Sequence, residues 1–167
     1  MRICNTSIIN IRLMAKRFVF MLMLLMSIVA RAQNADALYD EGKKLYDQKK
    51  YELAFKKLLP AAQKGHKKAQ YRVGRCYDKG HGVKEDNQKA YQWYLKGAQQ
   101  GHAKSQYQLG RCYMKGKGCT QDAAKAKSWL LKAVKNPKGG DKVVEKIKED
   151  IADGDKDAIA IKKIVGL

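Results

Sequence analysis

The sequence predicts an all-α protein, an α/α solenoid of antiparallel helix pairs with a C-terminal helical cap. The first observation is an internal repeat, because residues 69–98 return with many identities at residues 105–134, 36 positions later. The second is an apolar spacing of three and four within each copy, which is typical of helices. A period in this range indicates a stacked array whose units bury a shared core between neighbours.

Glycine, aromatic and charged residues account for most of the identities. Residues that recur 36 positions later are Tyr71, Gly74, Arg75, Cys76, Tyr77, Lys79, Gly80, Gly82, Asp86, Lys89, Ala90, Trp93 and Lys96. Glycine inside a helix costs about 1 kcal/mol relative to alanine. Its recurrence at Gly74 and Gly110 therefore predicts close contact between helices at these two positions.

Each copy is expected to form a helix A and a helix B. In the first copy, helix A is expected from Lys67 to Lys79 and to stop at Gly80, since glycine adopts the left-handed conformation at low cost. Asp86 is placed to cap helix B. The residues expected to face inward are Ala69, Val73, Gly74 and Tyr77 in helix A, and Ala90, Trp93, Tyr94, Gly97 and Ala98 in helix B. The aromatic residues expected in the core of the two copies are Tyr77, Trp93, Tyr113 and Trp129.

The two regular units occupy residues 67–102 and 103–136, and less regular segments flank them. Residues 33–66 form a degenerate helix pair, with helices expected near 35–48 and 51–64. Pro60 is expected to kink or shorten the second of these helices. Residues 137–167 lack the repeat signature and are expected to form two short helices, because an array needs ends with a polar outer face.

The second copy carries the pattern of a known repeat. The residues concerned are Leu109-Gly110, Tyr113, Lys115-Gly116-Lys117-Gly118, Asp122, Lys125-Ala126, Trp129 and Lys132-Ala133. They resemble the Sel-one-like repeat, a longer-looped relative of the tetratricopeptide repeat, whereas residues 33–66 look closer to a tetratricopeptide unit. The resemblance implies an α/α superhelix and an adaptor that binds other proteins, without shared catalytic residues. Cys119 in place of an aliphatic residue and Gly97 in place of alanine depart from the pattern.

Residues 1–32 predict a secretory signal peptide, in which Met14 is an alternative start to Met1. Lys16 and Arg17 precede a thirteen-residue apolar run at 18–30, and Ala30-Arg31-Ala32 supplies small residues for cleavage after Ala32. The run is shorter than the roughly 20 residues of a spanning helix. We therefore expect a secreted or periplasmic protein with no transmembrane helix after cleavage. An uncleaved membrane anchor is the alternative.

The chain is strongly basic. It has 35 Lys and Arg against 16 Asp and Glu, and five of the basic residues but none of the acidic ones lie in residues 1–32, which leaves +14 for residues 33–167. Such a charge favours anionic partners through long-range attraction. We expect an acidic protein or peptide partner, with an anionic glycan or lipid head group as the alternative. Nucleic acid is not expected to meet an exported protein.

The predicted binding surface is the concave face built by the A helices. Three successive units place an aromatic residue three positions before the helix-A glycine and a cation one position after it. With their flanking lysines, these residues are Tyr39, Lys43, Lys68, Tyr71, Arg75, Lys104, Tyr107 and Arg111. Arginine can bind carboxylates or phosphates with two parallel hydrogen bonds, and tyrosine adds flat contact area with a polar tip. The alternative is that the tyrosines only pack and the cations are only solvated.

The cysteines allow two interpretations. Cys112 and Cys119 either form a disulfide, as exported proteins can, or serve as small buried apolar residues. Cys76 and Cys112 occupy equivalent positions on neighbouring helices about 8–10 Å apart, beyond the roughly 7 Å between Cα atoms that a disulfide tolerates. Arg111 beside Cys112 suggests a lowered thiol pKa.

The sequence predicts neither an enzyme nor a cofactor or metal site. His66, His81 and His102 fall in separate turns or loops rather than three or four residues apart on one helix face. The glycine pairs at 80–82 and 116–118 follow no strand and precede no Gly-Lys-Ser/Thr, so a phosphate-binding loop is not indicated. No nucleophile is paired with a base in the repeat pattern.

Overall fold

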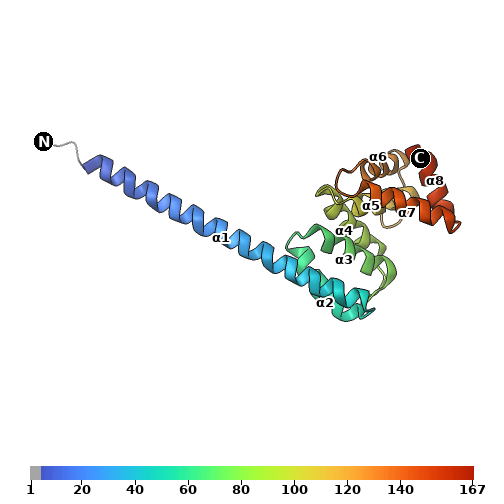
Figure 1. Ribbon diagram of the computed structural model, residues 1–167, viewed down its shortest axis with the longest axis horizontal. Helices are drawn as coiled ribbons and strands as arrows, with labels where there is room; N and C mark the ends of the chain where they lie inside the picture. The colour runs from blue at the N-terminus through green and yellow to red at the C-terminus, as the bar shows by residue number, and fades with distance from the viewer. Residues whose placement is uncertain (1–4) are drawn as a thin grey trace.

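The computed structural model describes the backbone of residues 5–167 and the side chains of residues 17–23, 26 and 34–167. Every regular element in this range is a helix, and the predicted all-α solenoid is confirmed (Figure 1). The helices are α1 (Asn5–Asp47), α2 (Tyr51–Gln63), α3 (Lys67–Lys79), α4 (Asn87–Gln99), α5 (Ala103–Lys115), α6 (Ala123–Val134), α7 (Gly140–Ala152) and α8 (Lys156–Val165). Helices α1 and α2, α3 and α4, and α5 and α6 form pairs, and each pair packs on the next.

Helix α1 differs from its prediction, because it is continuous from Asn5 to Asp47 rather than beginning near residue 35. Its first part projects away from the helix pairs (Figure 1). The apolar side chains described there are exposed, from 46% at Leu22 to 69% at Met26. Within the described residues, no helix has the length and apolarity needed to cross a bilayer. The predicted cleavage motif at 30–32 lies outside the residues whose side chains are described.

Local signals set the helix ends in the repeats. Helix α3 spans the predicted Lys67–Lys79 and ends at Gly80, whose φ of 66° is left-handed. Asp86 caps α4, because its carboxylate accepts a hydrogen bond of 2.9 Å from the Lys89 amide. Pro60 lies inside α2, which continues to Gln63, one residue short of the predicted end. A proline three residues from the helix end leaves most of the helix intact.

Each helix pair is closed by a large side chain of helix B that packs against a glycine of helix A. A Cβ added at Gly42 would lie 2.7 Å from Leu58 Cγ, one at Gly74 would lie 2.6 Å from Tyr94 Cε1, and one at Gly110 would lie 2.7 Å from Leu130 Cγ. The close helix contact predicted from the recurring glycines is therefore confirmed. Leu58, Tyr94 and Leu130 are 36 residues apart and fully buried.

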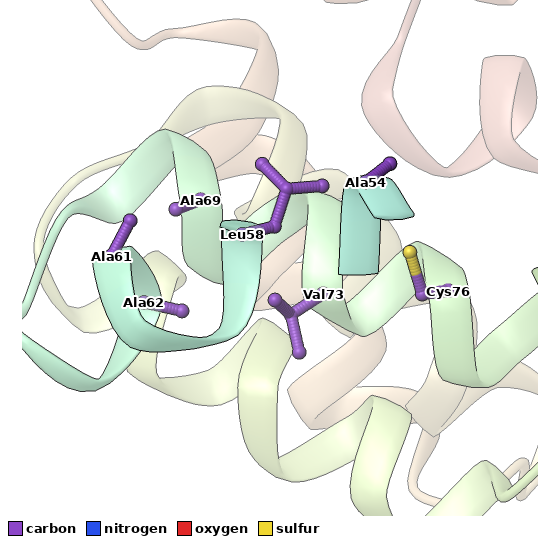
Figure 2. Packing of buried hydrophobic residues seen from close by; sticks show 7 residues of the cluster. All are labelled: Ala54, Leu58, Ala61, Ala62, Ala69, Val73 and Cys76. Atoms are coloured by element: carbon purple, nitrogen blue, oxygen red, sulfur yellow. The ribbon is translucent and has the colours of Figure 1, made fainter. Parts of the chain in front are cut away.

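Small residues fill the rest of the first core cluster. Figure 2 shows how α2 and α3 contribute Ala54, Leu58, Ala61, Ala62, Ala69, Val73 and Cys76, each at most 1% exposed. The small side chains let the two helices approach closely. Burying their apolar surface contributes roughly 25 cal/mol per Å².

The aromatic residues expected in the core lie at its edges. Tyr77, Trp93, Tyr113 and Trp129 are only partly buried, although each packs against a core cluster. Lys96 and Lys132 place their ammonium groups 4.4 and 4.5 Å from the ring centroids of Trp93 and Trp129. These cations shield the outer ring faces, and the deeply buried aromatic residues are instead Tyr94 and Tyr107.

Helices α7 and α8 cover the end of the array, as predicted for a cap. Val143, Ile147 and Ile161 from these helices join Leu130 and Ala133 of α6 in one buried cluster. This cluster also contains Tyr107 of α5. The cap therefore packs on both helices of the last repeat.

The three cysteines whose side chains are described carry free thiols. Cys76 and Cys112 are buried, Cys119 is partly buried, and none of the three is in a disulfide. Of the two interpretations left open for Cys112 and Cys119, the structure has the unpaired one. Burial raises the pKa of the Cys112 thiol to about 12, with Cys119 and Asp78 adding to it, so the lowered pKa suggested by Arg111 is wrong.

Gly97 replaces the usual alanine because Ser105 occupies the space of a methyl group. A Cβ at Gly97 would lie 2.4 Å from Ser105 Oγ, which is fully buried and 2.9 Å from His102 Nδ1. The same positions one repeat earlier hold Ala61 and Ala69. The interface between α4 and α5 thus has glycine and serine where the interface between α2 and α3 has two alanines.

Gly97→Ala is expected to destabilise the wild-type chain by about 1 kcal/mol and to cost less in a Ser105→Ala chain. Overpacking costs about 1–3 kcal/mol against a gain of about 1 kcal/mol in helix propensity, and removing Ser105 Oγ leaves the contact of 3.0 Å with the Cβ of residue 105 as the closest. Urea unfolding of the two single variants and the double variant measures the coupling. Additive effects of the two substitutions would contradict the steric explanation.

Candidate functional site

A groove of about 570 Å³ lies between the A helices and the cap. Its walls come from α3, α5 and α7, and Tyr94 of α4, Lys117 in the loop after α5 and Asp155 at the start of α8 complete the lining. The charged residues in its lining are Arg75, Asp78, Lys79, Lys104, Arg111, Lys115, Lys117, Lys142, Glu145, Lys146, Glu149, Asp150 and Asp155. Cations outnumber carboxylates there, so the groove favours an anionic ligand.

Five of the eight predicted binding residues line this groove. They are Tyr71, Arg75, Lys104, Tyr107 and Arg111. The other three lie elsewhere: Tyr39 stacks on His66 with ring centroids 4.3 Å apart, Lys43 pairs with Asp47 at 3.3 Å, and Lys68 is exposed. The structure therefore brings together five of the six predicted residues of the two regular repeats, all except Lys68, and leaves out the two of the degenerate unit.

Arg111 interacts with two carboxylates at the start of α8. Its Nη2 donates to Asp157 Oδ2 at 3.3 Å and lies 3.8 Å from Asp155 Oδ2. Lys115, one turn further along α5, also pairs with Asp157. The hydrogen bond from Lys115, with Arg111 adding to it, lowers the pKa of the Asp157 carboxyl below its usual range. Two cations spaced four residues apart thus hold one carboxylate.

Arg75 occupies the equivalent place on α3 without such a partner. No carboxylate oxygen lies within 4.0 Å of Arg75, Lys104 or Lys142 in the part of the chain that the structure describes. Burial lowers the pKa of the Lys104 ammonium, and the cations Arg72, Lys142, Arg75 and Lys146 lower it further. The middle of the groove therefore carries uncompensated positive charge.

Two buried amides and a partly buried imidazole lie at the contacts between neighbouring helix pairs. Gln70 and Gln106 donate to the carbonyls of Ala62 and Ala98, the same contact in two repeats. Burial lowers the pKa of the His102 imidazole to about 4, with Lys67, Lys104 and Lys68 contributing, so His102 is neutral at neutral pH. The two amide contacts join α3 to α2 and α5 to α4.

Sequence reasoning missed the contribution of the cap. Lys142 and Lys146 of α7 and the carboxylates of Asp155 and Asp157 reach the groove from segments without the repeat pattern. The recurrence of Lys79 at Lys115 was a signal that could have added these two residues. Nothing in the sequence pattern placed the start of α8 beside α5.

Comparison with known proteins identifies the repeat. Residues 67–102 and 103–137 each match the family model of the Sel1 repeat. The chain contains two Sel1 repeats. Sel1-repeat proteins generally mediate protein–protein interactions and are generally non-enzymatic scaffolds. None of the curated proteins compared matches the chain.

Two solved structures show how much of the Sel1 fold the chain shares. A Sel1 repeat protein from Oxalobacter formigenes is 34% identical over 77% of this chain and 53% of its own, with a TM-score of 0.59. The protein c5321, a protective antigen present in uropathogenic Escherichia coli strains that displays an SLR fold, is 26% identical over 78% of this chain and 28% of its own, with a TM-score of 0.59. This Sel1-repeat chain thus spans about half the length of the first and under a third of the second.

Proposed function

We propose that this chain is an exported adaptor that binds an acidic protein segment in the groove between its A helices. The observation that carries the proposal is the group of cations at Arg75, Lys104 and Lys142, which line one groove together with Tyr71 and have no carboxylate within 4.0 Å among the described residues. An arginine can bind a carboxylate with two parallel hydrogen bonds, and a neighbouring tyrosine adds flat apolar contact area.

The proposal of export is supported by the signal-like sequence of residues 1–32. The apolar side chains described in that segment are exposed and belong to a part of α1 that projects from the helix pairs (Figure 1). Exposed apolar side chains in such a helix suit a membrane or an export machinery better than water. A secreted or periplasmic location follows from this proposal.

Affinity capture from a native cell-envelope extract tests the adaptor function. The groove variant carries Arg75→Glu and Lys104→Glu. The matched control carries Lys56→Glu and Lys127→Glu, two exposed lysines outside the groove, so both variants have the same net charge. We expect to capture a protein that the wild-type chain and the control variant retain and that the groove variant does not. After purification, this protein should bind the wild-type chain directly.

The same experiment separates the adaptor from a receptor for an anionic glycan or lipid. A ligand held by the general basic surface should be weakened equally in both variants and should be released steeply by salt. Equal retention by the two variants would contradict groove binding. Circular dichroism of both variants shows whether the helices remain intact.

A further inference from the structure

The two regular repeats present the same pair of cations. Among the described residues, only the pair on α5, the filled pair, binds a carboxylate from another helix, and the pair on α3 is the open pair. Arg111 and Lys115 on α5 correspond to Arg75 and Lys79 on α3, 36 residues earlier. The pair on α5 holds Asp157. On α3, Lys79 has only its sequence neighbour Asp78, at 4.0 Å, and Arg75 has no carboxylate among the described residues.

Two aspartates at the start of α8 form the ligand of the filled pair. Asp155 is the N-cap of α8, where its Oδ1 accepts from the amides of Asp157 at 2.7 Å and Ala158 at 3.3 Å. Its other carboxylate oxygen faces Arg111, and Asp157 follows two residues later. Carboxylates at a helix start are stabilised by the positive end of the helix dipole, so this arrangement is rigid and preformed.

The surroundings of the open pair reinforce its preference for an anion. Lys104 and Lys142 stand beside Arg75 in the groove, and their charges repel one another without a carboxylate to compensate them. The filled pair has the carboxylates of Asp155 and Asp157 beside it. The open pair therefore has the stronger uncompensated positive charge of the two.

We infer that Arg75 and Lys79, with Lys104, bind a partner segment carrying two aspartates two residues apart at the start of a helix, as Arg111 and Lys115 bind the start of α8. The inference rests on the proposed function and names the chemistry of the partner. The start of α8 is an internal copy of the ligand, held by the second repeat, while the first repeat remains open to another protein.

The probe for this inference is a peptide with the sequence of residues 153–166, acetylated and amidated. It contains three aspartates and three lysines, so its net charge is zero and the general basic surface does not attract it. One control peptide replaces the aspartates at 155 and 157 by asparagine. A second has the same composition with the aspartates moved to its far end. The full chain in mild detergent is titrated with each, and the Nε–Hε signal of Arg75 is followed by NMR at low salt.

We expect a saturable shift of the Arg75 signal with the probe and an affinity about tenfold lower for both control peptides, because charge-assisted hydrogen bonds need the carboxylates in place. Arg75→Gln should reduce the affinity about tenfold, measured by anisotropy of the labelled probe, whereas Lys127→Gln on the outer face should leave it unchanged. Equal binding of all three peptides, or no effect of Arg75→Gln, would overturn the inference.

The peptide titration and the envelope capture can fail independently, so they test the helix-start ligand and the adaptor function separately. If envelope capture depends on Arg75 but the probe does not shift its signal, the helix-start ligand is wrong and the adaptor function stands. If capture is independent of the groove, the adaptor proposal fails whatever the peptides do.

Discussion

Gly118→Ala is expected to lower the free energy of unfolding by about 3 kcal/mol or more. Gly118 has a φ of +75°, and a Cβ there would lie 2.0 Å from the carbonyl oxygen of Asn87. The obstacle is backbone, so no side-chain rotation relieves it. The loop of the second repeat would have to move away from the start of α4.

Gly101→Ala is the matched control for this substitution. Gly101 has nearly the same φ, +73°, but nothing lies within 4 Å of its added Cβ. Its replacement should cost only the left-handed backbone strain, about 1–2 kcal/mol. Urea unfolding followed by circular dichroism measures both variants, and equal losses would show that loop packing on α4 contributes nothing.

Leu130→Ala is expected to cost about 3 kcal/mol, since truncation of a fully buried leucine removes apolar contacts and leaves a cavity. Leu130 is 0% exposed and packs against Gly110 of α5, in the same cluster as Ile147 and Ile161 of the cap. The loss should therefore loosen the cap as well as the last repeat, because arrays are stabilised by contacts between neighbours.

Leu53→Ala provides the comparison for Leu130→Ala. Leu53 is 52% exposed on α2, so its truncation should change the free energy of unfolding by no more than about 0.5 kcal/mol. Adding Gly110→Ala to Leu130→Ala should recover part of the loss, because the new methyl group enters the space left by the leucine. A loss at Leu130 as small as that at Leu53 would contradict the packing described for α5 and α6.

Much of the fold follows from local sequence. The helix from Lys67 to Lys79, its stop at Gly80 and the cap at Asp86 were all predicted, because backbone conformation and short-range hydrogen bonds decide them. The start of α1 was not predicted, since residues 1–32 were assigned to a signal peptide and not to the first helix.

The candidate site was predictable only in part. The repeat placed Tyr71, Arg75 and Arg111 on one face, because equivalent residues of stacked units point the same way. Tyr107 is only 4% exposed, as buried as the core around it, which fits the alternative that this tyrosine only packs. The cap covers Tyr107, and the position of the cap depends on long-range packing.

The sequence by itself determined the repeated unit: its helix lengths, its glycine stops and the recurrence of a cation pair at 75 and 79 and at 111 and 115. Only the tertiary structure decided which pair is filled. Ile147 and Ile161 anchor the cap on Leu130, and this packing brings Asp157 to Arg111 rather than to Arg75. Packing between segments far apart in the chain distinguishes two sites that share the same pair of cations.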